Sequence, residues 1–221
     1  MKNLSFIIFL FTFSSLINAQ AIFEKLPKII KANEHYVFYS HGLIVEGDNP
    51  KPVHGRFGEY DFPAIKNALA DEKYNLIAHH RPLKTDPFKY ASALSKQVTT
   101  LLNNGVAPKN ITLIGFSRGG FITALASNLL ANKALNFVIM AACTSRLAKN
   151  KELVIHGNLL SIYETTDGVG SCNDVISRNP EAISSYKEVA ITTGKEHGAF
   201  YTPNPAWLIP LKTWLKKQDN E

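Results

Sequence analysis

The chain has 221 residues, of which 45% are hydrophobic and 19% are charged, and its formal net charge at pH 7 is +6. These fractions are ordinary for a globular protein, and the chain contains no repeat or low-complexity tract. The basic residues are scattered without interleaved aromatic residues, so the charge indicates a solvated surface with at most weak attraction to anionic surfaces, and not a nucleic-acid partner.

The first residues have the pattern of a cleavable secretory signal. Lys2 supplies a positive charge, residues 4–17 form an apolar run, and the chain then passes through Ala19 and Ala21, either of which fits the cleavage position. The apolar run is shorter than the ~20 residues of a spanning helix, and no cysteine follows it for lipidation. We therefore expect residues 22–221 to form a single domain without a membrane span, secreted or periplasmic, and assumed to be a monomer.

Strand-like and helix-like segments alternate along this domain. The strand-like runs are 36–40, 75–79, 110–115, 136–141, 158–163 and 188–192, and helical periodicity covers 64–70, 90–102, 121–131 and 207–217. Such alternation predicts an α/β fold with a mostly parallel sheet of about six to seven strands, covered by helices on both faces. Ligands bind such sheets at the carboxyl ends of the strands.

The loop after the first long strand reads His41-Gly42-Leu43. Gly42 allows the backbone to turn so that the N–H of Leu43 faces Ser117, which follows the 110–115 strand. His41 is expected to make a structural hydrogen bond that shapes this loop, although it and Gly42 are also candidates for the pocket wall.

Residues 48–62 form a connection too long to be a mere linker between elements. His54, Arg56 and Tyr60 either line the pocket or are surface residues. His79 and His80 lack metal-site spacing with any partner, and the chain has neither a P-loop nor a G-x-G-x-x-G after a strand. We therefore expect no metal and no cofactor.

Gly115-Phe116-Ser117-Arg118-Gly119 is a G-x-S-x-G pattern between the 110–115 strand and the 121–131 helix. A sharp turn there would strain Ser117, and glycines two residues to either side remove Cβ atoms that would collide with the neighbouring chain. The N–H of Arg118, at the start of the helix, would face a forming oxyanion. The alternative is a serine that only caps the helix.

Cys143 and Cys172 belong to a chain that is expected to be exported, where disulfides persist. If bonded, they would close a loop of about 30 residues and contribute roughly 3 to 4 kcal/mol. Two free buried thiols are the alternative.

A nucleophilic serine needs a general base, because its own hydroxyl ionises far above neutral pH. His197 is the one histidine in a loop between the final strand and the final helix, and the alternative is that it is exposed to solvent. The orienting acid should follow the 158–163 strand, where Asp167 lies in a turn with glycine. Glu164, at the end of that strand, and Asp174, deep in the next loop, are the rivals.

Ser117, Asp167 and His197 occur in the order used by the α/β-hydrolase superfamily, which this chain resembles over the whole domain. The segments YDFPAI, GFSRGG and LSIYETTD look like a small exported branch of serine hydrolases. Residues 22–35 are too few for the usual first two strands, and few residues separate 136–141 from 158–163. We therefore expect a trimmed sheet and an open cleft without a large cap.

The resemblance implies two-step acyl transfer, with Asp167 orienting His197 and the N–H groups of Leu43 and Arg118 holding the oxyanion. The leading hypothesis is a carboxylic ester hydrolase that acts on a small-molecule ester. A serine peptidase or amidase on the same fold is the first alternative. A hydrolase-fold binding protein without turnover is the second.

Overall fold

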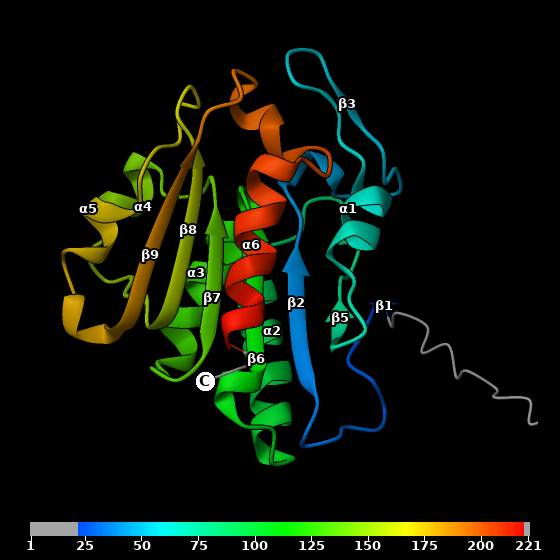
Figure 1. Ribbon diagram of the computed structural model, residues 1–221, viewed down its shortest axis with the longest axis vertical. Coiled ribbons are helices and arrows are strands. Elements are labelled where there is room, and N and C mark those ends of the chain that lie inside the picture. Colours follow the sequence, from blue (N-terminus) through cyan, green and yellow to red (C-terminus); the bar gives the residue numbers. More distant parts are fainter. Residues whose placement is uncertain (1–21, 219–221) are drawn as a thin grey trace, which may run out of the picture.

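Parallel strands form the centre of the computed structural model, which describes residues 22–218 (Figure 1). One sheet has the order β1-β5-β2-β6-β7-β8-β9, and each neighbouring pair in it is parallel. The strands are β1 (Ile22–Phe23), β2 (His35–Ser40), β5 (Tyr74–Ile77), β6 (Ile111–Phe116), β7 (Asn136–Met140), β8 (Gly157–Glu164) and β9 (Ile183–Ile191). The predicted mostly parallel sheet is confirmed. The predicted signal sequence, residues 1–21, lies outside the described residues.

The start of the sheet is short, as expected from the few residues before the first long strand, because β1 has only two residues. One other strand differs from the expectation. β9 starts at Ile183, five residues before the predicted run. Its first half carries half-buried and exposed side chains, so the sequence has no apolar run that would predict this part of the strand.

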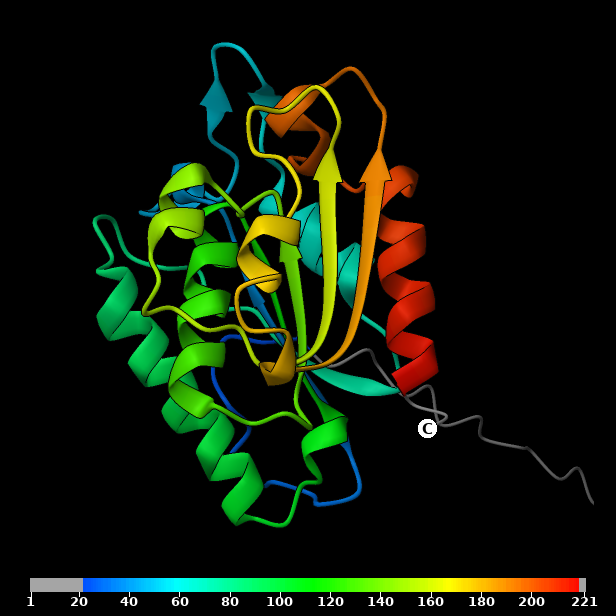
Figure 2. The same ribbon diagram turned by 90° about the vertical axis from the view of Figure 1, so that its left-hand side faces the viewer.

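Helices cover both faces of the sheet, as Figure 2 shows from the side, with α2 and α3 on one face and α6 on the other. They are α1 (Phe62–Leu69), α2 (Pro87–Asn103), α3 (Arg118–Leu130), α4 (Ser145–Lys149), α5 (Asn173–Ile176) and α6 (Pro205–Gln218). The four predicted helices are α1, α2, α3 and α6. α1 and α2 start earlier than the periodicity indicates. The Asp61 side chain accepts from the N–H of Ala64, and the Asp86 side chain accepts from the N–H groups of Phe88 and Lys89. Each helix also has a proline among its first two residues.

Alternating strand residues divide the core into two layers. In β2, Val37 and Tyr39 pack into the layer under α1 and α6, whereas Tyr36 and Phe38 pack into the layer under α2 and α3. Strands buried on both faces explain why these segments appear in the sequence as nearly continuous apolar runs.

Strand register brings the functional loops to one end of the sheet. Gly115 of β6 lies opposite both Ser40 of β2 and Ile139 of β7, so the residues that follow these three strands meet at the same level. A small hairpin, β3 (Val53–His54) and β4 (Gly58–Glu59), rises beside this end (Figure 1). The connection from β7 to β8 carries only the short helix α4, which leaves the end without a large cap.

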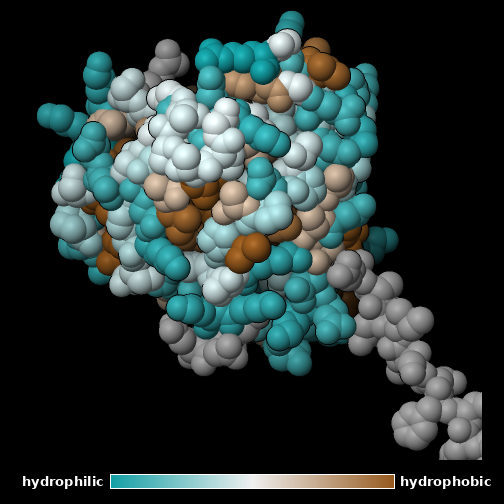
Figure 3. Space-filling view, turned by 45° about the horizontal axis from the view of Figure 1, so that its top comes forward, coloured by the Kyte–Doolittle hydropathy of each residue, from teal (hydrophilic) through white to brown (hydrophobic). Residues whose placement is uncertain are grey.

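Hydrophilic residues cover most of the face seen in Figure 3, and hydrophobic residues show there as small separate patches. Within residues 22–218, no helix is long and apolar enough to cross a bilayer.

Candidate active site

Ser117 lies in a strained turn between β6 and α3. Its φ of 52° and ψ of −116° are uncommon for a residue with a side chain, and its N–H donates to the carbonyl of Met140 at 2.9 Å. A Cβ on Gly115 would lie 2.2 Å from the carbonyl oxygen of Gly119, and a Cβ on Gly119 would lie 1.8 Å from the carbonyl oxygen of Ser40. Only glycine fits at both positions, so the pattern is required by the close packing of this turn.

His197 and Asp167 extend from Ser117 in one line of contacts. His197 Nε2 lies 2.8 Å from Ser117 Oγ, and His197 Nδ1 lies 2.6 Å from Asp167 Oδ2. An ionised carboxylate only accepts, so Nδ1 carries the proton and Nε2 is left to accept from the serine hydroxyl. The imidazole is packed against Phe116, with ring centroids 4.8 Å apart. This geometry can remove a proton from the serine as it attacks.

Glu164, the rival acid, has a different set of partners. One carboxylate oxygen accepts from the N–H and hydroxyl of Thr166, and the other accepts from the N–H groups of Thr193 and Gly194. Burial alone would raise the pKa of Glu164, but these hydrogen bonds outweigh it and lower the pKa to about 2. Glu164 therefore ties the turn before Asp167 to the loop before His197.

Asp174, the other rival, is exposed in α5 and takes no part in these contacts.

The two expected oxyanion donors lie beside Ser117. Arg118 is the first residue of α3, and Leu43 is the first residue of a 3₁₀ helix, Leu43–Val45. The N–H of a first helical residue has no partner within its own helix, so both are available to a ligand. Both residues and Ser117 line one pocket.

A buried network supports the loop that carries Leu43. His41 is fully buried; its Nε2 accepts from the N–H of Arg81 at 2.9 Å, and its Nδ1 donates to the carbonyl of Gly42 at 2.8 Å. Burial lowers the pKa of His41 well below its usual range, and the charge of Arg81 lowers it further, so the imidazole is neutral. The guanidinium of Arg81 donates to the carbonyl of His41 and pairs with buried Glu46. His41 thus shapes the loop and does not line the pocket.

Arg81 and Glu46 have no signal in the sequence, since an arginine and a glutamate in loops are ordinarily solvated. Only the folded chain shows that both are buried.

The other predicted pocket residues are not among those that line the pocket of Ser117. Tyr60 is in the core, where its hydroxyl lies 2.7 Å from that of Tyr39, and this burial corrects the expectation of a pocket or surface residue. His54 stacks on Phe57 in the hairpin. Arg56 pairs with Glu196, next to His197, at 2.6 Å.

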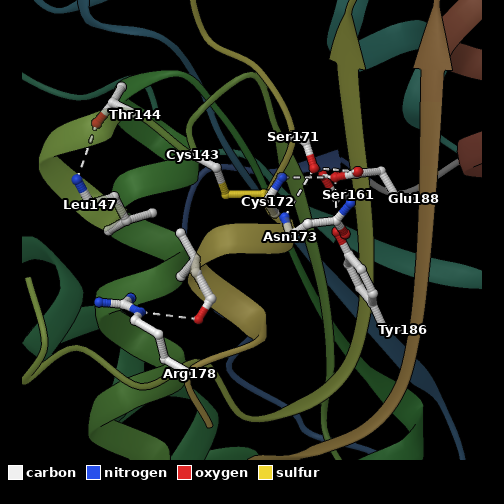
Figure 4. Close-up of a disulfide and its surroundings, with 11 residues drawn as sticks. Cys143, Thr144, Leu147, Ser161, Ser171, Cys172, Asn173, Arg178, Tyr186 and Glu188 are labelled. Atoms are coloured by element: carbon white, nitrogen blue, oxygen red, sulfur yellow. Dashed lines mark hydrogen bonds between the residues drawn. A yellow bond between two sulfur atoms is a disulfide. The ribbon is translucent and has the colours of Figure 1, made fainter. Parts of the chain in front are cut away.

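A disulfide joins Cys143, just after β7, to Cys172, just before α5, in agreement with the expected pairing. Figure 4 shows Glu188 of β9 beside it. The Glu188 carboxylate accepts from the N–H of Cys172 at 2.8 Å and from the hydroxyls of Ser171 and Tyr186 at 2.6 and 2.8 Å. The segment that follows Asp167 is therefore fixed on both sides.

Solved structures share this architecture. The HSL-homolog EstE7 from a metagenome library aligns with a TM-score of 0.62 and 14% identity over 85% of this chain and 80% of its own. Arabidopsis thaliana SOBER1 aligns with a TM-score of 0.55 and 16% identity over 84% of this chain and 99% of its own. The chain has the α/β-hydrolase fold.

A truncated carbohydrate esterase from gut microbiota has the same α/β-hydrolase fold, with a TM-score of 0.53 and 13% identity over 89% of this chain and 90% of its own. No protein-family model matches the sequence, and no curated protein matches it. Within residues 22–218 of this α/β-hydrolase fold, no group of three or more His, Cys, Asp or Glu side chains is arranged to hold a metal ion.

Proposed function

We propose that the chain is a serine hydrolase that cleaves carboxylic esters through an acyl-enzyme, with Ser117 as nucleophile. The observation that carries the proposal is the line of contacts from Ser117 Oγ to His197 and on to Asp167, at 2.8 and 2.6 Å. A serine that only caps α3 would need neither a positive φ nor an imidazole in contact, and Ser117 makes no capping hydrogen bond.

In the first step, His197 Nε2 takes the Ser117 proton while Oγ forms a bond to the ester carbonyl carbon. The N–H groups of Leu43 and Arg118 hold the oxygen that becomes negative. Asp167 keeps the imidazole oriented and stabilises its positive charge. His197 then gives the proton to the leaving alcohol as the C–O bond breaks, which leaves Ser117 acylated.

The second step repeats this sequence with water. His197 takes a proton from water, the hydroxide attacks the acyl carbon, and the same two N–H groups hold the oxyanion. The proton returns to Ser117 Oγ, and the carboxylic acid leaves.

The fold supports a hydrolase, and the proteins that share it include a thermostable esterase and a truncated carbohydrate esterase. Ester cleavage is favoured over peptide cleavage as the leading assignment, and the test includes both bonds. We also propose that the protein is exported, which the disulfide between buried Cys143 and Cys172 supports, since such bonds persist in oxidising compartments.

The test is intact-mass spectrometry of the purified mature protein after treatment with a fluorophosphonate probe, beside Ser117→Ala. One adduct on the wild type and none on the variant is the expected result. The wild type should also hydrolyse 4-nitrophenyl esters faster than peptide 4-nitroanilides. A wild type that takes no adduct, or a Ser117→Ala protein that hydrolyses esters at the wild-type rate, would refute the proposal.

A further inference from the structure

One cavity of about 480 Å³ opens directly beside Ser117. Its walls are Phe88 of α2, Phe121 of α3, Leu147 of α4 and Val169, and Ala141 and Ala142 line it where β7 ends. Its volume lies in the range of roughly 300 to 1,000 Å³ that small-molecule sites occupy.

Most of the side chains that line this cavity are apolar, and Thr144 and Asn150 are polar exceptions. The rings of Phe88 and Phe121 meet edge to face, with centroids 5.9 Å apart and planes at 90°. Phe88 is nevertheless 62% exposed, which leaves a large apolar side chain facing solvent beside the nucleophile. Ala141 and Ala142 have only methyl side chains, so the space next to Ser117 stays open.

Among the described residues that line the cavity, only Arg118 is charged. Its guanidinium donates to the carbonyl of Thr85 at 3.2 Å. The bulk of the cavity therefore offers hydrophobic contact.

The positions of the other groups decide which part of an ester would enter. The leaving oxygen must lie on the side of His197, which protonates it, and the oxyanion must face the N–H groups of Leu43 and Arg118. Neither His197 nor Asp167 lines the cavity, whereas Ser117, Leu43 and Arg118 do. With the leaving oxygen toward His197 and the oxyanion toward the two N–H groups, the acyl chain would extend into the cavity.

A second hollow, next to His197, has more charged residues in its lining, beside the rings of Phe57 and Tyr201. Arg56 and Glu196 form an ion pair there, and Lys195 and Glu59 line the same hollow. A leaving alcohol would meet polar and charged groups on that side.

We propose that the cavity beside Ser117 binds the acyl chain, and that the substrates are esters of apolar carboxylic acids longer than acetic acid. This inference rests on the proposed ester hydrolysis. Each methylene that enters an apolar cavity gains about 0.8 kcal/mol when fully buried, which corresponds to about fourfold in kcat/KM.

The experiment compares kcat/KM for 4-nitrophenyl acetate, butyrate and hexanoate, which share one leaving group. With partial burial of the four added methylenes, the value should rise by at least about tenfold from acetate to hexanoate. A flat or falling series would overturn the inference. Faster cleavage of the 4-nitrophenyl monoester of a dicarboxylic acid than of 4-nitrophenyl hexanoate would also overturn the inference. Arg118, and not the apolar walls, would then be the dominant contact.

Variants of the wall give a second measurement. Phe88→Ala and Phe121→Ala should each reduce the ratio of hexanoate to acetate kcat/KM by about threefold or more. Ile209→Ala removes an apolar side chain of α6 that is as exposed as Phe88, and it should leave this ratio unchanged. An unchanged ratio in both wall variants would overturn the inference.

The fluorophosphonate adduct separates the two proposals. A labelled wild type with a flat series would overturn the acyl cavity alone, and an unlabelled wild type that cleaves none of the esters would overturn both.

Discussion

Replacing Glu164 with glutamine tests the idea that this carboxylate holds the two loops of the site together. Glutamine keeps one acceptor oxygen and turns the other into an NH₂ group, which must face N–H donors of either Thr166 or the Thr193–Gly194 pair. The gap between the ordinary pKa of 4.5 and the value of about 2 in the folded chain corresponds to about 3 kcal/mol. The nearby loops face solvent, whose screening lowers the figure to about 2 kcal/mol.

The direction of the pH dependence follows from the lowered pKa. The stabilisation by Glu164 is complete above pH 4.5 and is lost as the pH falls toward 2, because the unfolded chain takes up the proton first. Glu164→Gln should therefore lose about 2 kcal/mol in the free energy of unfolding near pH 7 and differ less from the wild type as the pH falls. Its kcat should fall too, because Thr193 and Gly194 lead into the loop of His197.

Urea unfolding of both proteins at pH 7 and near pH 3, without reducing agent, measures this difference. Glu181→Gln is the matched control, since that carboxylate is exposed. A Glu164→Gln protein as stable as the control variant at pH 7, or an equal deficit at both pH values, would show that the carboxylate does not act as described.

Three further variants test other contacts. Gly119→Ala should lower kcat for 4-nitrophenyl esters by at least about a hundredfold, because its Cβ would collide with the Ser40 carbonyl. Gly55→Ala is the control, since Gly55 has open space around it, and it should keep the wild-type kcat. Equal activities of the two variants would contradict this prediction. Arg81→Met should cost about 3 to 5 kcal/mol in urea unfolding, because it leaves buried Glu46 unpaired, and native-like stability would contradict this. Removing the disulfide with serines at both cysteines should cost about 3 to 4 kcal/mol for a loop of 29 residues, measured in the same way, and no loss would show that the bond leaves the unfolded chain unconstrained.

The sheet and its main helices could be predicted because strands buried on both faces keep continuous apolar runs, and because α2 and α3 keep a helical period. β9 was predicted too short because its first half lies at the sheet edge with exposed side chains. The hairpin β3–β4 and the short helices α4 and α5 give no period long enough to detect.

The sequence also indicated which candidates for nucleophile, acid and base would lie together, since strand ends in a parallel sheet meet at one edge, and the structure brings Ser117, Asp167 and His197 into contact there. The sequence favours Asp167 over Glu164 because Asp167 lies beyond the strand in a turn with glycine, but Glu164 ends the same strand, and only the folded loops show which carboxylate meets His197. Tyr60 was misplaced for a related reason: a tyrosine in a long loop looks exposed until its partner, Tyr39, is known.

The edge position of β9 affects which part of the fold opens first under destabilising conditions. Among residues 22–218, β9 is the last strand in the order and pairs with β8 alone, and the loop that follows it carries His197. Edge elements open locally at lower free energy than central strands such as β6, which holds Ser117 between two neighbours. Opening of β9 would separate His197 from Ser117 while the rest of the core stayed closed. Loss of activity would then report the fraying of one edge of the sheet, well before the whole domain unfolds.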